Sequence, residues 1–492
     1  MSYLLALDQG TTSSRAIIFD EYGKVHATAQ REIQIHTPHS GWVEQDAQEI
    51  WTTQIAVVQQ AMASAHLLAI DIKAIGLTNQ RETTVVWDKR TGHPLAPAIV
   101  WQDRRASEWC NHLIEQQLEQ KIQTKTGLRI DPYFSAGKLV WLLEHIEGLR
   151  ELAKQGHVAF GTIDSWLIWN LTQGAEHIIE MSNASRTMLM HLQTQTWDEE
   201  LLTLFGIPPS VLPRIVSSDA YIANTAQGLL GAEIPITGVL GDQQSALFGQ
   251  SCFEMGSAKN TYGTGCFMLF NTGQEIRHSH NQLLTTLAWN CHDQPTYALE
   301  GSVFMAGAIV QWLRDGLGII QQSSDVEHLA CQVSSTDGVV LVPAFTGLGA
   351  PHWDTEARAL LCGMSRGTNK AHIARAALES IAFQVSDVLT AMQSDITHPL
   401  KELRVDGGAS QNDMLMQFQA DILNVPVLRP KLLESTAWGA AAMAGLKAGV
   451  FSSLSEISAS WTLDRQFEPQ MSEDERQHHL GLWNTALNRA KS

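Results

Sequence analysis

The first twenty residues place two apolar runs on either side of a polar turn. Leu4–Leu7 and Ala16–Phe19 are short and apolar, and the turn residues between them bound them as strands. The intervening segment, Asp8–Arg15, carries an acid, a glycine, four hydroxyls and an arginine. The pattern predicts a β-hairpin whose turn is rich in groups that bind ions.

The chemistry of this turn suits a phosphate and a metal ion. Backbone N–H groups, hydroxyls and an arginine are phosphate ligands, which here are supplied by Thr11, Thr12, Ser13 and Arg15. Asp8 ends the first strand and is placed to hold Mg²⁺ directly or through water, since Mg²⁺ takes few carboxylates and keeps its waters. For this segment taken alone, an ordinary polar hairpin is the alternative.

The pattern recurs further along the chain. Ser257–Phe270 again predicts strand, turn and strand, with Thr264 between Gly263 and Gly265. In Leu403–Asn412 a strand runs into a Gly-Gly turn and then a helix. Two such hairpins and a strand–turn–helix unit indicate a nucleotide clamped between two related domains.

Periodicity between these segments predicts further strands and a helix. Val25–Arg31 and Ile72–Leu77 are expected strands. Asp46 and Glu49 have the spacing of a capping box at a helix start. The apolar positions at helical spacing in that helix are Trp51, Ile55, Val58 and Met62. A later segment, Glu434–Gly445, predicts a helix of small residues packed closely against a sheet or hinge.

Two longer segments carry a resemblance to a known family. Tyr133–His145 and Gly363–Glu379 resemble the two signatures of the FGGY carbohydrate kinases, which belong to the actin-like ATPase superfamily. Shorter segments are similar to the members of that family that act on glycerol: Asn79–Thr84, Trp101–Gln102, Asp131–Tyr133 and Gly241–Gln244. The resemblance covers nearly the whole chain.

The resemblance implies an α/β fold of two ribonuclease-H-like domains, as in the actin-like ATPases, with an interdomain cleft for nucleotide and substrate. Pattern alone predicts only mixed α/β. We place the boundary near residue 250. Residues 1–250 would then form an N-terminal domain with the polyol site and the first phosphate hairpin. Residues 251–492 would form a C-terminal domain with the second hairpin and the adenosine site.

The implied activity is phosphorylation of glycerol to sn-glycerol 3-phosphate, the first step of glycerol catabolism, with ATP and Mg²⁺. Two alternatives stay open: another FGGY kinase acting on xylulose, ribulose or gluconate, and a non-metabolic ATPase switch of the actin or chaperone kind. The polar pocket expected around Arg81, Glu82, Tyr133 and Asp242 favours a kinase, because a switch needs no polyol site.

Arg81 and Glu82 offer donors and acceptors that suit two adjacent hydroxyls, although such a pair alone is more often a surface ion pair. With the motif matches, the implied acceptor-binding residues are Thr11, Arg81, Glu82, Trp101, Tyr133, Asp242, Gln243 and Phe267. The implied nucleotide-binding residues are Thr11, Thr12, Ser13, Arg15, Thr264, Gly307, Gln311, Gly408 and Asn412. Helix packing is an equally good explanation of Gly307.

Asp242 is the predicted catalytic base and, with Asp8, a predicted Mg²⁺ ligand. It follows the apolar strand Ile236–Leu240, and carboxylates at strand ends of α/β sheets are often functional. Gln243 and Gln244 come next and cannot act as bases. The alternative is a helix N-cap aspartate.

Composition excludes some partners. The formal net charge of −18 over 492 residues argues against nucleic acid and anionic membrane surfaces. The longest apolar runs are too short to insert into a membrane. Six cysteines without CxxC spacing predict reduced core thiols in a cytoplasmic protein. We expect a small-molecule substrate and a homo-oligomer, either a dimer or a tetramer.

Two positions bear on regulation. In some bacterial family members an arginine before the Ile-Pro that corresponds to Ile234-Pro235 helps to bind the inhibitor fructose 1,6-bisphosphate. Here Glu233 occupies that position, and its negative charge should repel a bisphosphate. Glu475 matches a position that some members use to bind a sugar-transport regulatory protein, but an acidic helical tail explains it without a partner.

Overall fold

The computed structural model describes residues 2–354, 356–396 and 398–492. Its N-terminal sheet has the strand order β13-β14-β5-β1-β2-β3. The hairpin β1–β2 and its neighbour β3 are antiparallel, whereas β5 and β14 run parallel to β1 on its other side. The strands are β1 (Tyr3–Gln9), β2 (Ser13–Asp20), β3 (Val25–Glu32), β5 (Ile72–Asn79), β13 (Ala223–Asn224) and β14 (Pro235–Gly241).

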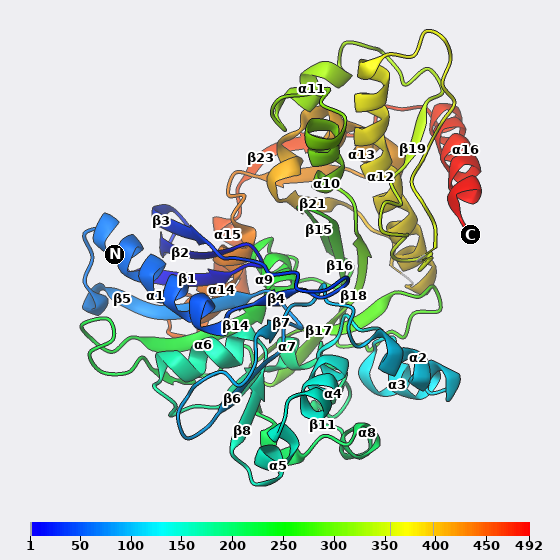
Figure 1. Cartoon of the computed structure of the whole chain (residues 1–492). Helices are drawn as coiled ribbons and strands as arrows, with labels where there is room; N and C mark the ends of the chain where they lie inside the picture. The colour runs from blue at the N-terminus through cyan, green and yellow to red at the C-terminus, as the bar shows by residue number, and fades with distance from the viewer. Residues whose placement is uncertain (1, 355, 397) are drawn as a thin grey trace.

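The C-terminal sheet repeats this arrangement in the order β17-β18-β16-β15-β21-β22-β23. The hairpin β15–β16 and β18 are antiparallel, and β21 and β22 continue parallel on the other side of β15. The strands are β15 (Ala258–Tyr262), β16 (Cys266–Gly273), β17 (Leu284–Cys291), β18 (Gln294–Val303), β21 (Leu403–Asp406), β22 (Val427–Pro430) and β23 (Leu463–Phe467). The expected α/β fold of two ribonuclease-H-like units is confirmed, and Figure 1 shows them as two lobes.

Helices cover the sheets and fill the segments between strands (Figure 1). In the first half they are α1 (Ala47–Ser64), α2 (Ser107–Glu115), α3 (Glu119–Thr126), α4 (Ser135–His145), α5 (Leu149–Lys154), α6 (Ile163–Leu171), α7 (Met181–Ala184), α8 (Glu199–Phe205) and α9 (Asp242–Gly249). In the second half they are α10 (Gly307–Gln311), α11 (Asp325–Ala330), α12 (Lys370–Asp395), α13 (Asp413–Leu423), α14 (Ser435–Lys447), α15 (Leu454–Ser460) and α16 (Glu473–Ala490). None of the helices within the described ranges is long and apolar enough to cross a membrane.

Short strands complete the fold in two-stranded pairs. They are β4 (Glu44–Gln45), β6 (Val85–Asp88), β7 (Ala98–Ile99), β8 (Val158–Gly161), β9 (Ile178–Glu180), β10 (Met190–His191), β11 (Thr196–Trp197), β12 (Arg214–Val216), β19 (Val340–Val342) and β20 (Leu360–Cys362).

The helix of small residues, α14, belongs to the second half of the chain but packs on β1, β5 and β14 of the first sheet. A Cβ at Gly76 would lie 2.1 Å from the carbonyl oxygen of Ala440. At Gly439 it would lie 1.9 Å from that of Ser245 in α9. The expected close packing is confirmed, because no larger side chain fits at either contact.

The start of α1 differs from the expected capping box. Asp46 does cap the helix by accepting the N–H of Gln48 at 2.7 Å. Glu49 turns away and accepts the N–H of Gln34 at 3.4 Å, so the reciprocal bond to Asp46 does not form. The prediction of the helix start was correct, but that of the box was wrong.

The buried face of α1 is partly rotated from the expected one, although Val58 and Met62 are buried as predicted. Trp51 and Ile55 are only half-buried. The residues that face the core, where α1 packs on β2 and β3, are Ala47, Ile50, Gln54, Val57, Val58, Ala61 and Met62.

The structure also tests the predictions for the cysteines and for the C-terminal tail. All six cysteines are unpaired, but Cys331 is exposed and Cys362 is half-buried, so the prediction of core thiols was wrong for these two. The tail forms α16 as expected, and Glu475 forms a capping box with Ser472 at its start. This cap gives Glu475 a role within the helix itself.

Candidate active site

A sharp turn after β5 places two charged side chains in the interior. The N–H of Thr83 bonds to the carbonyl of Arg81 at 2.7 Å, and Glu82 between them has a φ of 60°. Positive φ is uncommon for a residue other than glycine, and such outliers cluster at functional sites. The side chains of Arg81 and Glu82 are 2% and 1% exposed, so they do not form a surface ion pair.

Arg81 is held by partners from both halves of the chain. Its Nη1 and Nη2 donate to the two carboxylate oxygens of Glu300 at 2.5 and 3.0 Å. Its Nε lies 3.0 Å from Oδ1 of Asp242, and Nη1 also donates to Gln244 at 3.3 Å. Because Glu300 lies on β18, this ion pair joins the two sheets.

A second buried arginine completes the cluster. Arg186 donates from Nε to Glu82 at 2.6 Å and from Nη2 to Glu300 at 3.0 Å. Sequence reasoning missed both Arg186 and Glu300, which are 104 to 219 positions from their partners. The sequence signal that could have revealed Glu300 was its charge inside the apolar strand Tyr297–Val303.

The two carboxylates of this cluster have opposite pKa shifts. Burial would raise the pKa of Glu300, but Arg186 and Arg81 together lower it to about 2. Burial raises the pKa of Glu82, and the two arginines offset this only in part while Glu300 adds to it. Glu300 is therefore firmly ionised and anchors the cluster.

Asp242 lies at the edge of the cluster, with its side chain 30% exposed. It is the first residue of α9, and Gly241 occupies the cap position, so the N-cap alternative was wrong. Its Oδ1 accepts the N–H of Gln243 at 2.7 Å. Burial raises the pKa of Asp242, while Arg81 and Lys259 act in the opposite direction. The result is a partly accessible carboxylate in fixed orientation.

Lys259 on β15 faces Asp242 from the C-terminal sheet. Its Nζ donates to Oε1 of Gln243 at 2.5 Å and to Oγ1 of Thr261 at 2.8 Å. Burial lowers its pKa to about 8, against the attraction of Asp406 and Asp242. Sequence reasoning did not identify this lysine, which lies in the second hairpin segment.

The predicted aromatic residues meet beside this cluster. The Nε1 of Trp101 donates to Oγ1 of Thr11 at 2.9 Å. The Trp101 ring packs edge-on against Tyr133 and Phe267, with centroids 5.6 and 6.3 Å apart. Residues from both hairpins thus converge at one place.

The first hairpin forms with Asp8 and Arg15 as cross-strand neighbours. Arg15 forms an ion pair with Asp8, and its Nη1 donates to Glu434 at 2.7 Å. Thr12 at the tip is exposed, and Ser13 accepts a hydrogen bond from a glutamine of β3. Glu434, which directly precedes α14, is a partner that the sequence did not reveal.

The second hairpin is bound to the start of α10. The N–H of Gly307 donates to the carbonyl of Gly263 at 2.9 Å, and a Cβ at Gly307 would lie 2.7 Å from that oxygen. The N–H groups of Ala306 and Ala308 bond to the carbonyl of Thr264. Gly263 and Thr264 remain exposed.

The third glycine segment adjoins the same hairpin. A Cβ at Gly407 would lie 2.5 Å from the carbonyl oxygen of Tyr262, at the end of β15. Gly408 is exposed and begins a 3₁₀ turn that precedes α13. Asn412 caps α13 by accepting the N–H of Leu415 at 2.9 Å, and Gln311 is exposed at the end of α10.

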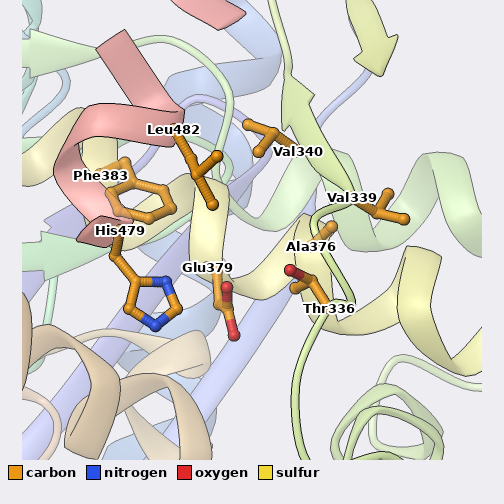
Figure 2. Close-up of a pocket in the computed structure, with 8 residues that line it drawn as sticks. All are labelled: Thr336, Val339, Val340, Ala376, Glu379, Phe383, His479 and Leu482. Carbon is orange, nitrogen blue, oxygen red and sulfur yellow. The ribbon is translucent and has the colours of Figure 1, made fainter. Parts of the chain in front are cut away.

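A small cavity lies elsewhere, between α12, α16 and the β19 region (Figure 2). Its volume is about 10 Å³, room for about one water molecule. Its lining includes Glu379, Phe383 and His479 but none of the predicted site residues.

Comparison with known proteins places the chain in a family. The model of the N-terminal domain of the FGGY carbohydrate kinases matches residues 3–249, and the model of the C-terminal domain matches residues 258–448. The chain belongs to the FGGY family of carbohydrate kinases.

Similar proteins are named more narrowly. The chain is 80% identical to a glycerol kinase of Acinetobacter baylyi, covering 100% of this chain and 99% of that one. It is 57% identical to a glycerol kinase of Deinococcus radiodurans, covering 99% and 97%. A crystal structure of Plasmodium falciparum glycerol kinase with ADP has a TM-score of 0.93 at 38% identity, covering 100% of this chain and 98% of that one.

Proposed function

We propose that this FGGY kinase phosphorylates glycerol with ATP, giving sn-glycerol 3-phosphate in the first step of glycerol catabolism. The observation that carries the proposal is the partly exposed Asp242 carboxylate, 3.0 Å from Nε of the buried Arg81. This places a proton acceptor beside a preformed polar cluster. The relatives named glycerol kinase support the same acceptor.

In this proposal Arg81 and Glu82 bind two adjacent hydroxyls. A guanidinium has five N–H donors and an ionised carboxylate has two acceptor oxygens, so both groups retain capacity beside their protein partners. The phenol of Tyr133 adds a polar contact, and its position near the arginines supports this role. The remaining acceptor-binding residues would be Thr11, Trp101, Gln243 and Phe267, with the aromatic rings against the carbon chain.

Asp242 would act as the general base. It would take the proton of a terminal hydroxyl onto its carboxylate while that hydroxyl oxygen attacks the γ-phosphorus, the bond from the γ-phosphorus to the bridging oxygen breaks, and ADP leaves. A base is most effective when its pKa lies near the working pH, and the raised pKa of Asp242 fits this role. Arg81 orients the carboxylate through Nε.

The two hairpins would bind the nucleotide from opposite sides. ATP supplies the phosphoryl group, and Mg²⁺ neutralises charge on its phosphates. The exposed tips at Thr12 and Thr264 support such a role. The binding residues would be Thr11, Thr12, Ser13, Arg15, Thr264, Gly307, Gln311, Gly408 and Asn412, with Asp8 and Asp242 as metal ligands.

A substrate panel tests the function. Turnover of glycerol, measured by coupled detection of ADP, should far exceed that of xylulose, ribulose and gluconate. Equal or better turnover of xylulose would overturn the proposal in favour of another FGGY kinase. ATP hydrolysis that no polyol stimulates would instead favour an ATPase switch.

The proposal also covers the domain division, the cellular location and the oligomeric state. The domain division at residue 250 into residues 1–250 and 251–492 is supported by the two sheets, although α14 crosses to the first of them. A cytoplasmic location is supported by the dependence on ATP and by the unpaired cysteines. A homo-oligomer is expected from the family resemblance.

A further inference from the structure

Three side chains that bind metals converge away from the active-site cluster. Asp219 follows β12 in the first half of the chain, and Cys291 and His292 lie at the turn between β17 and β18 in the second half. One ligand atom from each lies within 4.8 Å of the others. Asp219 and Cys291 are buried, whereas the side chain of His292 is 71% exposed.

Backbone contacts hold the two segments together without a ligand. The N–H of Ser218 donates to the carbonyl of Asn290, and the N–H of Asn290 donates to Oγ of Ser218, both at 3.0 Å. The N–H of His292 donates to Oδ2 of Asp219 at 3.1 Å. The three candidate ligands are therefore positioned by the fold itself.

The turn fixes the direction of His292. Cys291 pairs with Gln294, which leaves a two-residue hairpin loop of His292 and Asp293. Both loop residues have positive φ, at 52° and 59°, as a type I′ turn requires. The Nδ1 of His292 lies 3.3 Å from Sγ of Cys291 as a result.

We propose that Asp219, Cys291 and His292 form a binding site for Zn²⁺ that joins the two halves of the chain. A thiolate, an imidazole and a carboxylate are all zinc ligands. Zn–S and Zn–N bonds of about 2.3 and 2.0 Å at a tetrahedral angle separate the two donor atoms by roughly 3.5 Å. The observed 3.3 Å between Sγ and Nδ1 is close to that separation. Solvent can supply the fourth ligand beside the exposed histidine.

Binding would exchange a proton for the metal. Burial and the neighbouring Asp219 raise the pKa of Cys291 to about 12, so the thiol is protonated at neutral pH. As the S–Zn bond forms, the S–H bond breaks and the proton passes to water, with no change in oxidation state. The ammonium of Lys447 lowers the pKa of the same thiol. Its positive charge would also repel the metal ion.

Zinc binding to the full-length chain tests the proposal. After treatment with a chelator, the protein is titrated with Zn²⁺ in equilibrium dialysis, while a pH indicator follows proton release. We expect a site that binds one ion, releases a proton and raises the thermal midpoint. Co²⁺ at the same site should give a thiolate-to-metal absorption band.

Single substitutions assign the ligands. Cys291→Ser, Asp219→Asn and His292→Asn should each weaken this site by at least about 10- to 100-fold, the loss seen for outer-shell partners of metal sites. Asparagine tolerates positive φ, so His292→Asn keeps the turn and tests the site even if a buried variant fails to fold. The control Cys331→Ser removes an exposed thiol elsewhere and should bind normally. Failure to bind Zn²⁺, or unchanged affinity in His292→Asn, would overturn the proposal.

Discussion

Two arginines of the first half of the chain, Arg15 on β2 and Arg81 in the turn after β5, have similar partners in different surroundings. Arg15 and Arg81 are each held by two carboxylates. The side chain of Arg81 is 2% exposed and that of its partner Glu300 1%, whereas Arg15 and its partner Glu434 are 25% and 40% exposed. The Arg81–Glu300 pair is thus enclosed by protein, whereas the Arg15–Glu434 pair is partly in contact with water.

This difference decides what each arginine can do. Removing one member of a buried pair leaves an uncompensated charge, so Arg81 stays in place and shapes a fixed pocket. The Arg15–Glu434 pair is partly exposed and such pairs contribute little, so Arg15 can exchange Glu434 for a phosphate at small cost. Burial, rather than residue type, therefore decides whether an arginine keeps a fixed position or can exchange a protein partner for a ligand.

Asp242→Asn should have the largest effect, because it removes the proposed base and leaves the shape of the cluster almost unchanged. We expect turnover to fall by roughly 10²–10⁴-fold, the usual contribution of general base catalysis. Circular dichroism and ATP binding should stay normal. A near wild-type rate in a folded variant would remove Asp242 from the chemistry.

Glu300→Gln tests the buried side of the comparison. Arg81 and Arg186 would both lose their shared carboxylate, which should destabilise the fold by about 3–5 kcal/mol. In protein that remains folded, the KM for glycerol should rise more than the KM for ATP.

The matched control is Glu434→Gln, which removes an exposed partner of Arg15. It should change stability by no more than about 1 kcal/mol in urea unfolding. Equal losses in the two variants would show that burial does not separate the two arginines.

The pH dependence of stability provides a smaller test. The pKa of Glu300 is lowered to about 2 in the folded protein, below its ordinary value of 4.5. Between these values the unfolded state binds more protons, so the stabilisation is complete above pH 4.5 and is lost as the pH falls toward 2. Glu300→Gln should reduce this loss in acid denaturation. The same acid dependence in the variant would assign it to other carboxylates.

The same contrast explains what the sequence could predict. The hairpin at Asp8–Arg15 is visible because its strands and turn are adjacent in sequence, and the recurrence at Ser257–Phe270 predicts the second sheet. The partners of Arg81 are not visible because Glu300 lies 219 residues away on the other sheet. Only the folded topology brings the charge of Glu300, inside the apolar strand β18, to Arg81 in the turn after β5.

Interpretations of the local sequence were also partly wrong about the buried face of α1 and about the residue that caps α9. In α1 Val58 and Met62 are buried as expected, but the face that packs on β2 and β3 also includes Ile50 and Val57 in place of Trp51 and Ile55. Gly241 takes the cap position that the alternative interpretation gave to Asp242, and the Asp242 carboxylate lies beside Arg81. The roles of all the proposed site residues, Asp8, Gln311 and Asn412 among them, remain predictions.

The smallest expected effect concerns a charge outside both regions of the comparison. Glu233 is exposed and accepts a hydrogen bond from the side-chain amide of Asn224 at 3.0 Å. Its negative charge should repel fructose 1,6-bisphosphate, so this anion should leave the rate of glycerol phosphorylation almost unchanged. Inhibition curves for the wild type and Glu233→Gln measure this, since the amide removes the repulsion without adding an attractive cation. Strong inhibition of the wild type at low millimolar concentration would mean that a bisphosphate binds elsewhere, and the partly exposed arginine of the phosphate hairpin, Arg15, would be the first position to test.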